Sequence, residues 1–123
     1  MAKTLGIRTV SASKEQVVLA LDWRSEITQP AGLMHGGALM TLADTAGGSL
    51  SYANLPPGAT GTSTIESKTN FLAAVSSGTV TATARVLKAG RSVIVIETEV
   101  TDDQGRLVAK VAQTQIVLRP QTA

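Results

Sequence analysis

A single helical pattern lies inside a chain whose other segments have the composition of β-strands. Within residues 36–54 the apolar side chains recur at spacings of three and four, at Leu39, Leu42, Ala43, Ala46 and Leu50. This spacing places them on one face of a helix. The run Leu55-Pro56-Pro57-Gly58 ends that helix, because proline cannot continue it.

Strand patterns surround the helix on both sides. We expect strands over residues 17–23, 60–71, 78–87, 92–101 and 107–118, and residues 5–12 can pair with the first of these as a hairpin. Residues 24–34, which include Pro30 and Gly32, are expected to be irregular. One helix covers only one face of a sheet of about six strands. The sequence therefore predicts an α+β fold in two layers, as a single domain over residues 1–123.

Composition excludes several classes of site. The chain has no cysteine and one histidine, so we expect no disulfide, no zinc site and no bound metal. Its net charge is only +2 and its basic residues are scattered, which argues against nucleic acid as a partner. No stretch reaches the roughly 20 apolar residues of a membrane span. With no apolar run near Met1, we expect a cytoplasmic protein that does not associate with membranes.

The aromatic content points to a further property of the chain. Aromatic residues make up only 2% of the sequence, so the core must be built from small aliphatic side chains. Such side chains bury little area each. We therefore expect the chain to gain stability by oligomerising.

The start of the predicted helix combines residues suited to catalysis. His35-Gly36-Gly37 precedes it, and the first amides of a helix lack intrahelical partners and carry the positive end of the helix dipole. A carbonyl oxygen that gains negative charge could be stabilised there. Asp44 is a carboxylate among apolar helix residues, and the Gln29 amide lies six positions before His35. Each has a plainer interpretation: a turn, a helix cap or a solvated side chain.

Residues 35–44, His-Gly-Gly-Ala-Leu-Met-Thr-Leu-Ala-Asp, resemble the central-helix signature of hotdog-fold acyl-CoA thioesterases. The resemblance is to the branch that contains the phenylacetate-pathway thioesterases and the Arthrobacter-type 4-hydroxybenzoyl-CoA thioesterase. Residues 64–72, 88–92 and 102–109 resemble further segments of that family in the same order. The likeness extends over residues 27–118.

This resemblance implies a hotdog fold, in which an antiparallel sheet wraps around the central helix. It implies a homodimer or homotetramer with active sites at the dimer interface, an acyl-CoA substrate and no cofactor, since coenzyme A belongs to the substrate. Asp44 would act as nucleophile or general base, and the Gly36 amide would polarise the thioester carbonyl. Gln29, His35 and Thr64 would position the carbonyl or the attacking water. The turn Gly90-Arg91-Ser92 would bind the coenzyme A nucleotide and phosphates.

The spacing of Gly36 and Asp44 adds a geometric constraint. Eight residues of helix separate them by about 12 Å along the axis, far beyond hydrogen-bond reach of one carbonyl group. If both act on one thioester, they come from different subunits. Two alternatives remain. An enoyl-CoA hydratase on this fold would place its Asp before its His, the reverse of the order here. A non-catalytic acyl-CoA-binding module would bind the thioester without releasing the thiol.

Overall fold

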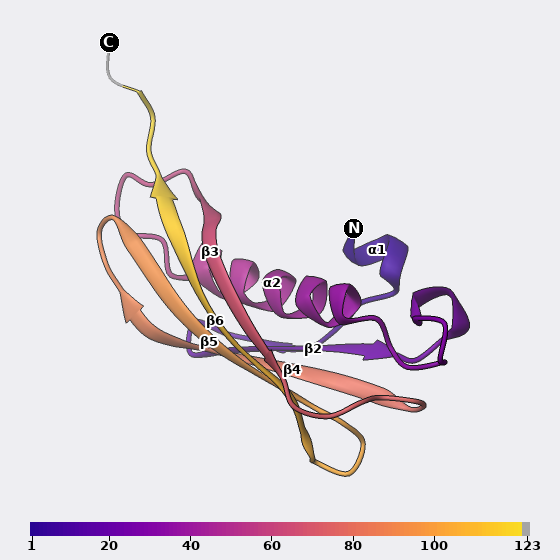
Figure 1. Ribbon diagram of the computed structural model, residues 1–123. Helices are drawn as coiled ribbons and strands as arrows, with labels where there is room; N and C mark the ends of the chain where they lie inside the picture. The colour runs from indigo at the N-terminus through magenta and orange to yellow at the C-terminus, as the bar shows by residue number, and fades with distance from the viewer. Residues whose placement is uncertain (122–123) are drawn as a thin grey trace.

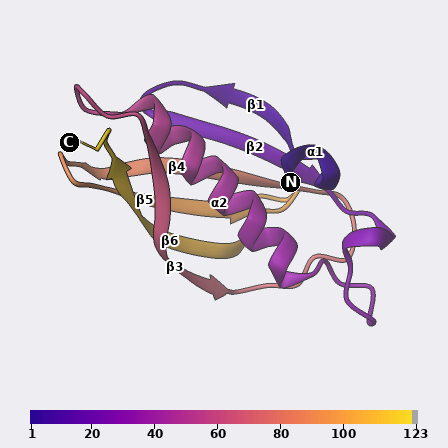
Figure 2. The ribbon, with the colours of Figure 1, turned by 90° about the horizontal axis from the view of Figure 1, so that it is seen from above.

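One long helix lies across a six-stranded antiparallel sheet. The computed structural model describes residues 1–121 and has the elements α1 (Ala2–Leu5), β1 (Arg8–Ala12), β2 (Gln16–Asp22), a 3-10 turn η1 (Ser25–Ile27), α2 (Gly36–Ala53), β3 (Gly61–Phe71), β4 (Thr79–Ala89), β5 (Val93–Thr101) and β6 (Leu107–Leu118). The strand order is β1-β2-β4-β5-β6-β3. The sheet curves around α2 (Figure 1), which crosses the strands diagonally (Figure 2). The predicted α+β hotdog architecture is confirmed.

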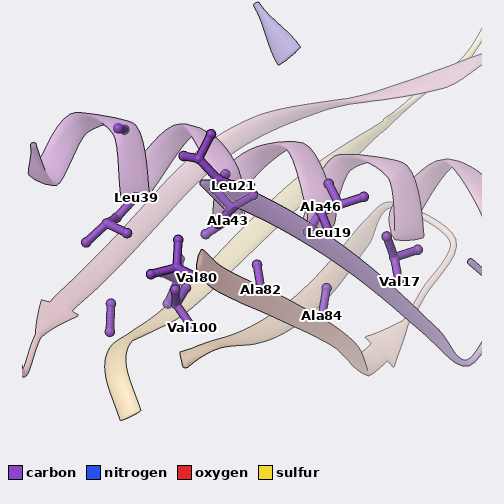
Figure 3. Close-up of a cluster of buried hydrophobic side chains, with 14 of the residues drawn as sticks. Val17, Leu19, Leu21, Leu39, Ala43, Ala46, Val80, Ala82, Ala84 and Val100 are labelled. Atoms are coloured by element: carbon purple, nitrogen blue, oxygen red, sulfur yellow. The ribbon is translucent and has the colours of Figure 1, made fainter. Parts of the chain in front are cut away.

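The core lies between α2 and the concave face of the sheet. The predicted helix face is buried throughout, and Leu42, Ala43, Ala46 and Leu50 have no exposed surface. On β4 the small side chains Ala82 and Ala84 face the helix, with side chains of β2 beside them (Figure 3). Such small residues let α2 approach the sheet closely, as the aliphatic composition predicted.

Both ends of α2 have local causes. His35 is the N-cap, and its Nδ1 atom accepts a hydrogen bond of 2.8 Å from the Gly37 amide. At the other end the Asn54 side chain donates to the carbonyls of Leu50 and Lys14, both at 2.9 Å. The Pro56-Pro57 pair follows, so the helix ends where the sequence predicted.

The structure corrects the prediction for the N-terminal residues. The strand expected over residues 5–12 begins only at Arg8, because Ala2–Leu5 form the short helix α1, which ends at Gly6 with φ 79°. Leu5 and Ile7 pack against the core instead of pairing in the sheet. The expected pairing of β1 with β2 is confirmed. Residues 24–34 are irregular, as predicted, apart from η1 and a bridge between Thr28 and Met34.

Strand β3 forms one edge of the sheet. Within residues 1–121 it pairs with β6 alone, and most of its eleven residues are exposed. Its register shifts between Thr64 and Glu66, a bulge that leaves Ile65 with 57% of its surface exposed. No helix among residues 1–121 is long and apolar enough to cross a membrane.

Candidate active site

Asp44 lies on the exposed side of α2 and is held by side chains from the sheet. Its Oδ1 atom accepts a hydrogen bond of 2.7 Å from the Thr64 hydroxyl and one of 3.2 Å from Gln113 Nε2. Gln115 Nε2 in turn donates to the Thr64 hydroxyl. Thr64 on β3 and Gln115 on β6 are paired in register, which brings the second amide to this network. Both hydrogen bonds to Asp44 reach the same oxygen.

Gly47 explains how Gln113 reaches Asp44. Gln113 is only 1% exposed and lies between β6 and the helix. A Cβ atom at Gly47 would overlap the Gln113 amide oxygen and lie 2.5 Å from its Cδ carbon. At Gly48, in contrast, a Cβ would meet nothing within 4 Å. The first glycine therefore provides room for a side chain, and the second faces open space.

Gly36 begins α2 with a free backbone amide. The Gly36 N–H makes no hydrogen bond to any of residues 1–121, as expected for the first position of a helix. The Phe71 ring lies beside it, with its Cζ carbon 3.1 Å from where a Gly36 Cβ would be. These two residues line a cavity of about 320 Å³ together with Gln29, Leu33, Met34, Leu39, Ala73, Ala74 and Val75. We call this the Gly36 hollow; its walls are mostly apolar.

Asp44 opens onto a different cavity. This Asp44 hollow, also about 320 Å³, is lined by Met1, Met40, Thr41, Asp44 and Ser67. It has no residue in common with the Gly36 hollow. Because α2 runs without a break from Gly36 to Ala53, the separation of about 12 Å along the helix axis holds in the structure. Within one subunit, the two groups cannot contact the same carbonyl carbon.

The structure separates Gln29 from His35. Gln29 lines the Gly36 hollow, although its Oε1 atom accepts a hydrogen bond of 2.6 Å from the Ala31 amide. The exposed His35 lines a third cavity, of about 230 Å³, with Ile27 and Thr28 among its neighbours. Of the residues expected to share one site, the structure brings together Asp44 with Thr64, and Gly36 with Gln29.

The turn Gly90-Arg91-Ser92 connects β4 to β5. Its residues are at least partly exposed, and the Ser92 carbonyl accepts a hydrogen bond from Val117 near the end of β6. Arg119 donates to the Arg91 carbonyl at 3.0 Å, which places a second cation beside Arg91. A Cβ at Gly90 would lie 2.9 Å from the Val93 carbonyl oxygen, so this tight turn requires glycine. The turn lines neither the Gly36 hollow nor the Asp44 hollow.

Sequence reasoning missed Gln113 and Gln115. A signal was present, because alternation along β6 directs Ala109, Val111 and Val117 inward and the two glutamines interrupt that apolar face. Among residues 1–121, no group of three or more His, Asp or Glu side chains is placed to hold a metal ion.

Comparisons with known proteins give the family. Residues 31–109, more than half of the chain, match the model of the Thioesterase superfamily. A 1,4-dihydroxy-2-naphthoyl-CoA hydrolase of Listeria monocytogenes is 32% identical over 108 residues, which cover 88% of this chain and 87% of that protein.

Solved structures agree with the family match. A thioesterase of Haemophilus influenzae superposes with a TM-score of 0.90 at 25% identity, covering 96% of this chain and 82% of the other. The PaaI protein of the E. coli phenylacetic acid degradation operon superposes with a TM-score of 0.88 at 26% identity, covering 99% of this chain and 86% of the other. This chain therefore belongs to the thioesterase superfamily, and the prediction of a thioester hydrolase with the hotdog fold is confirmed at the level of the family.

Proposed function

We propose that this chain hydrolyses acyl-CoA thioesters and that Asp44 supplies the reacting carboxylate. The observation that carries the proposal is the asymmetry of that carboxylate. Both of its hydrogen bonds reach Oδ1, while Oδ2 makes none with residues 1–121, and the side chain opens onto a hollow. A merely solvated carboxylate needs no such anchoring, whereas a nucleophile or general base needs one oxygen fixed and the other free.

Two routes give the same products. Along the first, Oδ2 attacks the thioester carbonyl, the C–S bond breaks, the thiolate takes up a proton and water then cleaves the mixed anhydride. Along the second, Asp44 accepts a proton from water as that water attacks the carbonyl. The net reaction is R-CO-S-CoA plus water to R-COOH plus CoA-SH. The Gly36 amide of a second copy stabilises the oxyanion in both, with Gln29 and His35 helping to position the carbonyl and Thr64 the carboxylate.

The acyl and nucleotide portions occupy different parts of the surface in this proposal. The apolar walls of the Gly36 hollow suit an aryl or medium-chain acyl group beside the oxyanion donor. The Listeria relative's name refers to an aryl-CoA substrate, which supports including aryl-CoAs among the candidates. Exposed Arg91, in the turn with Gly90 and Ser92, is suited to bind a phosphate of coenzyme A. The phenylacetate-pathway branch remains our prediction for the subfamily.

A thiol-release assay over a panel of acyl-CoAs tests the function. The panel should contain aryl, medium-chain and short-chain thioesters, with 1,4-dihydroxy-2-naphthoyl-CoA among them. We expect Asp44→Ala to lower kcat by about 10²- to 10⁴-fold with an unchanged circular dichroism spectrum, and Asp44→Glu to retain part of the activity. If Asp44→Ala turns over the panel like wild type, the assignment of Asp44 is wrong.

Two further measurements separate the alternatives. Tight acyl-CoA binding without thiol release would identify a binding module, and water addition to an enoyl-CoA would identify a hydratase. A single turnover in ¹⁸O-labelled water distinguishes the two hydrolytic routes, because label enters Asp44 only if an anhydride forms and water attacks its enzyme-side carbonyl.

A further inference from the structure

We propose that Gln113 is a positioning residue that holds the Asp44 carboxylate by Oδ1, so that Oδ2 is the reacting oxygen. This inference rests on the proposed function of Asp44. Gln113 follows the range matched by the family model, which ends at residue 109. Its position on β6 places it behind the helix, where it reaches Asp44 from the core side and does not contact solvent.

Burying Gln113 costs stability in two ways. Its Oε1 atom is buried without a hydrogen-bond partner among residues 1–121, and an unsatisfied buried acceptor is unfavourable. It also requires glycine at position 47, in the middle of α2, where alanine would favour the helix. An aliphatic side chain at position 113 would avoid the first cost, and a smaller one would avoid the second as well. The polar contact that Gln113 makes in return is the hydrogen bond from Nε2 to Asp44.

The chemistry of the amide fixes its orientation. A carboxylate only accepts hydrogen bonds, so the Gln113 NH₂ group must face Asp44 and Oε1 must face away. The reversed amide would place two acceptors against each other. The orphaned Oε1 beside Gly47 is therefore the consequence of directing the NH₂ group at the carboxylate.

A second branch reaches the same oxygen. Gln115, 2% exposed, donates to the Thr64 hydroxyl, which donates to Asp44 Oδ1. With Oδ1 accepting from β6 directly and from β3 through Thr64, the plane of the carboxylate is set by the sheet. Oδ2 is left for the substrate or the attacking water.

The test replaces Gln113 by methionine, which has similar length and no donor. We expect Gln113→Met to lower kcat by about 10- to 100-fold, the effect of one lost hydrogen bond to a charged group, with KM nearly unchanged. The melting temperature should stay the same or rise, since the unsatisfied acceptor is removed. A structural glutamine would give the opposite result, with lower stability and unchanged kcat. Gln113→Leu, a second apolar variant, should reproduce the loss of kcat.

Thr98→Val is the matched control. The Thr98 hydroxyl on the neighbouring strand β5 is likewise fully buried without a hydrogen-bond partner among residues 1–121, and it is not part of the Asp44 network. We expect Thr98→Val to keep the wild-type kcat. If wild type releases thiol and Asp44→Ala does not, while Gln113→Met keeps its kcat, the positioning role is overturned and the proposed function stands.

A crystal structure of Gln113→Met gives a readout independent of turnover. We expect the Asp44 carboxylate to rotate away from its wild-type orientation in this variant and to keep it in Thr98→Val. An unchanged orientation of the Asp44 carboxylate in Gln113→Met would overturn the inference, whatever the activity of wild type. If wild type released thiol from no acyl-CoA, the proposed function would be refuted instead.

Discussion

Phe71 is the aromatic side chain that lies against the first residue of α2, and it is 51% exposed at the rim of the Gly36 hollow. Its ring edge shields one side of the backbone whose amide we propose as the oxyanion donor. The ring supplies apolar surface to that hollow and no polar group. It should therefore contribute to binding of the acyl group and not to the chemical step.

Phe71→Ala should accordingly raise KM for the preferred acyl-CoA by about 3- to 10-fold, with a smaller change in kcat, because uniform apolar contact is lost. Steady-state kinetics over the acyl-CoA panel measures this split. Val10→Ala is the control, since it removes an exposed apolar side chain from β1 at the opposite edge of the sheet. A fall in kcat at constant KM would contradict this role.

At the scale of elements, α2 contains two adjacent glycines with opposite surroundings. Gly48→Ala should raise the free energy of unfolding by about 1 kcal/mol, because alanine favours a helix and the new Cβ meets open space. Gly47→Ala should lower it, because the same Cβ displaces the buried Gln113 side chain. Urea unfolding of both variants tests this contrast. Equal stabilisation by the two substitutions would show that Gln113 does not require the glycine.

The turn between β5 and β6 is organised by Asp102. Its Oδ1 accepts from the amides of Arg106 (2.9 Å) and Gln104 (3.0 Å), and Oδ2 accepts from Arg106 Nε at 2.9 Å. The hydrogen bond from the Arg106 amide is the main cause that lowers the pKa of the Asp102 carboxyl below its ordinary value of 3.8. Arg106 also donates to the Ala74 carbonyl, in the segment that lines the Gly36 hollow.

The lowered pKa gives Asp102→Asn a pH-dependent effect. A depressed pKa in the folded state means that ionised Asp102 stabilises the fold above its unfolded pKa and that this contribution is lost as pH falls through the folded value. The melting temperature of Asp102→Asn should therefore lie below that of wild type at pH 7, and the difference should shrink as pH falls below 3.8, the ordinary pKa of an aspartate carboxyl. Glu15→Gln removes an exposed carboxylate that makes no hydrogen bond with residues 1–121, and it serves as the control. A gap that persisted at low pH would count against the carboxylate as its origin.

Regular elements were predictable from the sequence, and the side-chain contacts between them were not. Periodicity and strand composition identified α2 and five of the six strands almost to the residue. The four residues of α1 are too few to show a period. Alternation along β6 directs Gln113 inward, but only the packing of α2 on the sheet determines that it meets Asp44 and Gly47. Gln29 and His35 lie in different cavities, which their six-residue spacing in an irregular segment did not predict.

At the scale of the whole molecule, one stripe of α2 faces away from the sheet and is exposed. Gly36, Met40 and Asp44 follow each other at intervals of one helical turn, and Met40 is 42% exposed between them. The neighbouring edge strand β3 has unpaired backbone groups along its outer side, which favours pairing with another strand. A two-fold dimer with antiparallel α2 helices would bring Gly36 of one copy towards Asp44 of the other, as the proposed reaction requires.

Mixing two inactive variants tests this arrangement. Asp44→Ala removes the carboxylate, and Gly36→Pro removes the amide hydrogen. Proline suits the first helical position, and His35, at ψ 135°, already has the backbone that precedes proline. The proline Cβ requires the half-exposed Phe71 ring to shift by a few tenths of an ångström. Each homodimer should be inactive.

Heterodimers made by co-refolding contain one site with both wild-type groups, so random mixing should restore about one quarter of wild-type activity. Mixing Asp44→Ala with Asp44→Asn is the control and should restore none. If the first mixture also stayed inactive although heterodimers formed, Gly36 and Asp44 of different copies would not share a site and the proposed arrangement would be wrong.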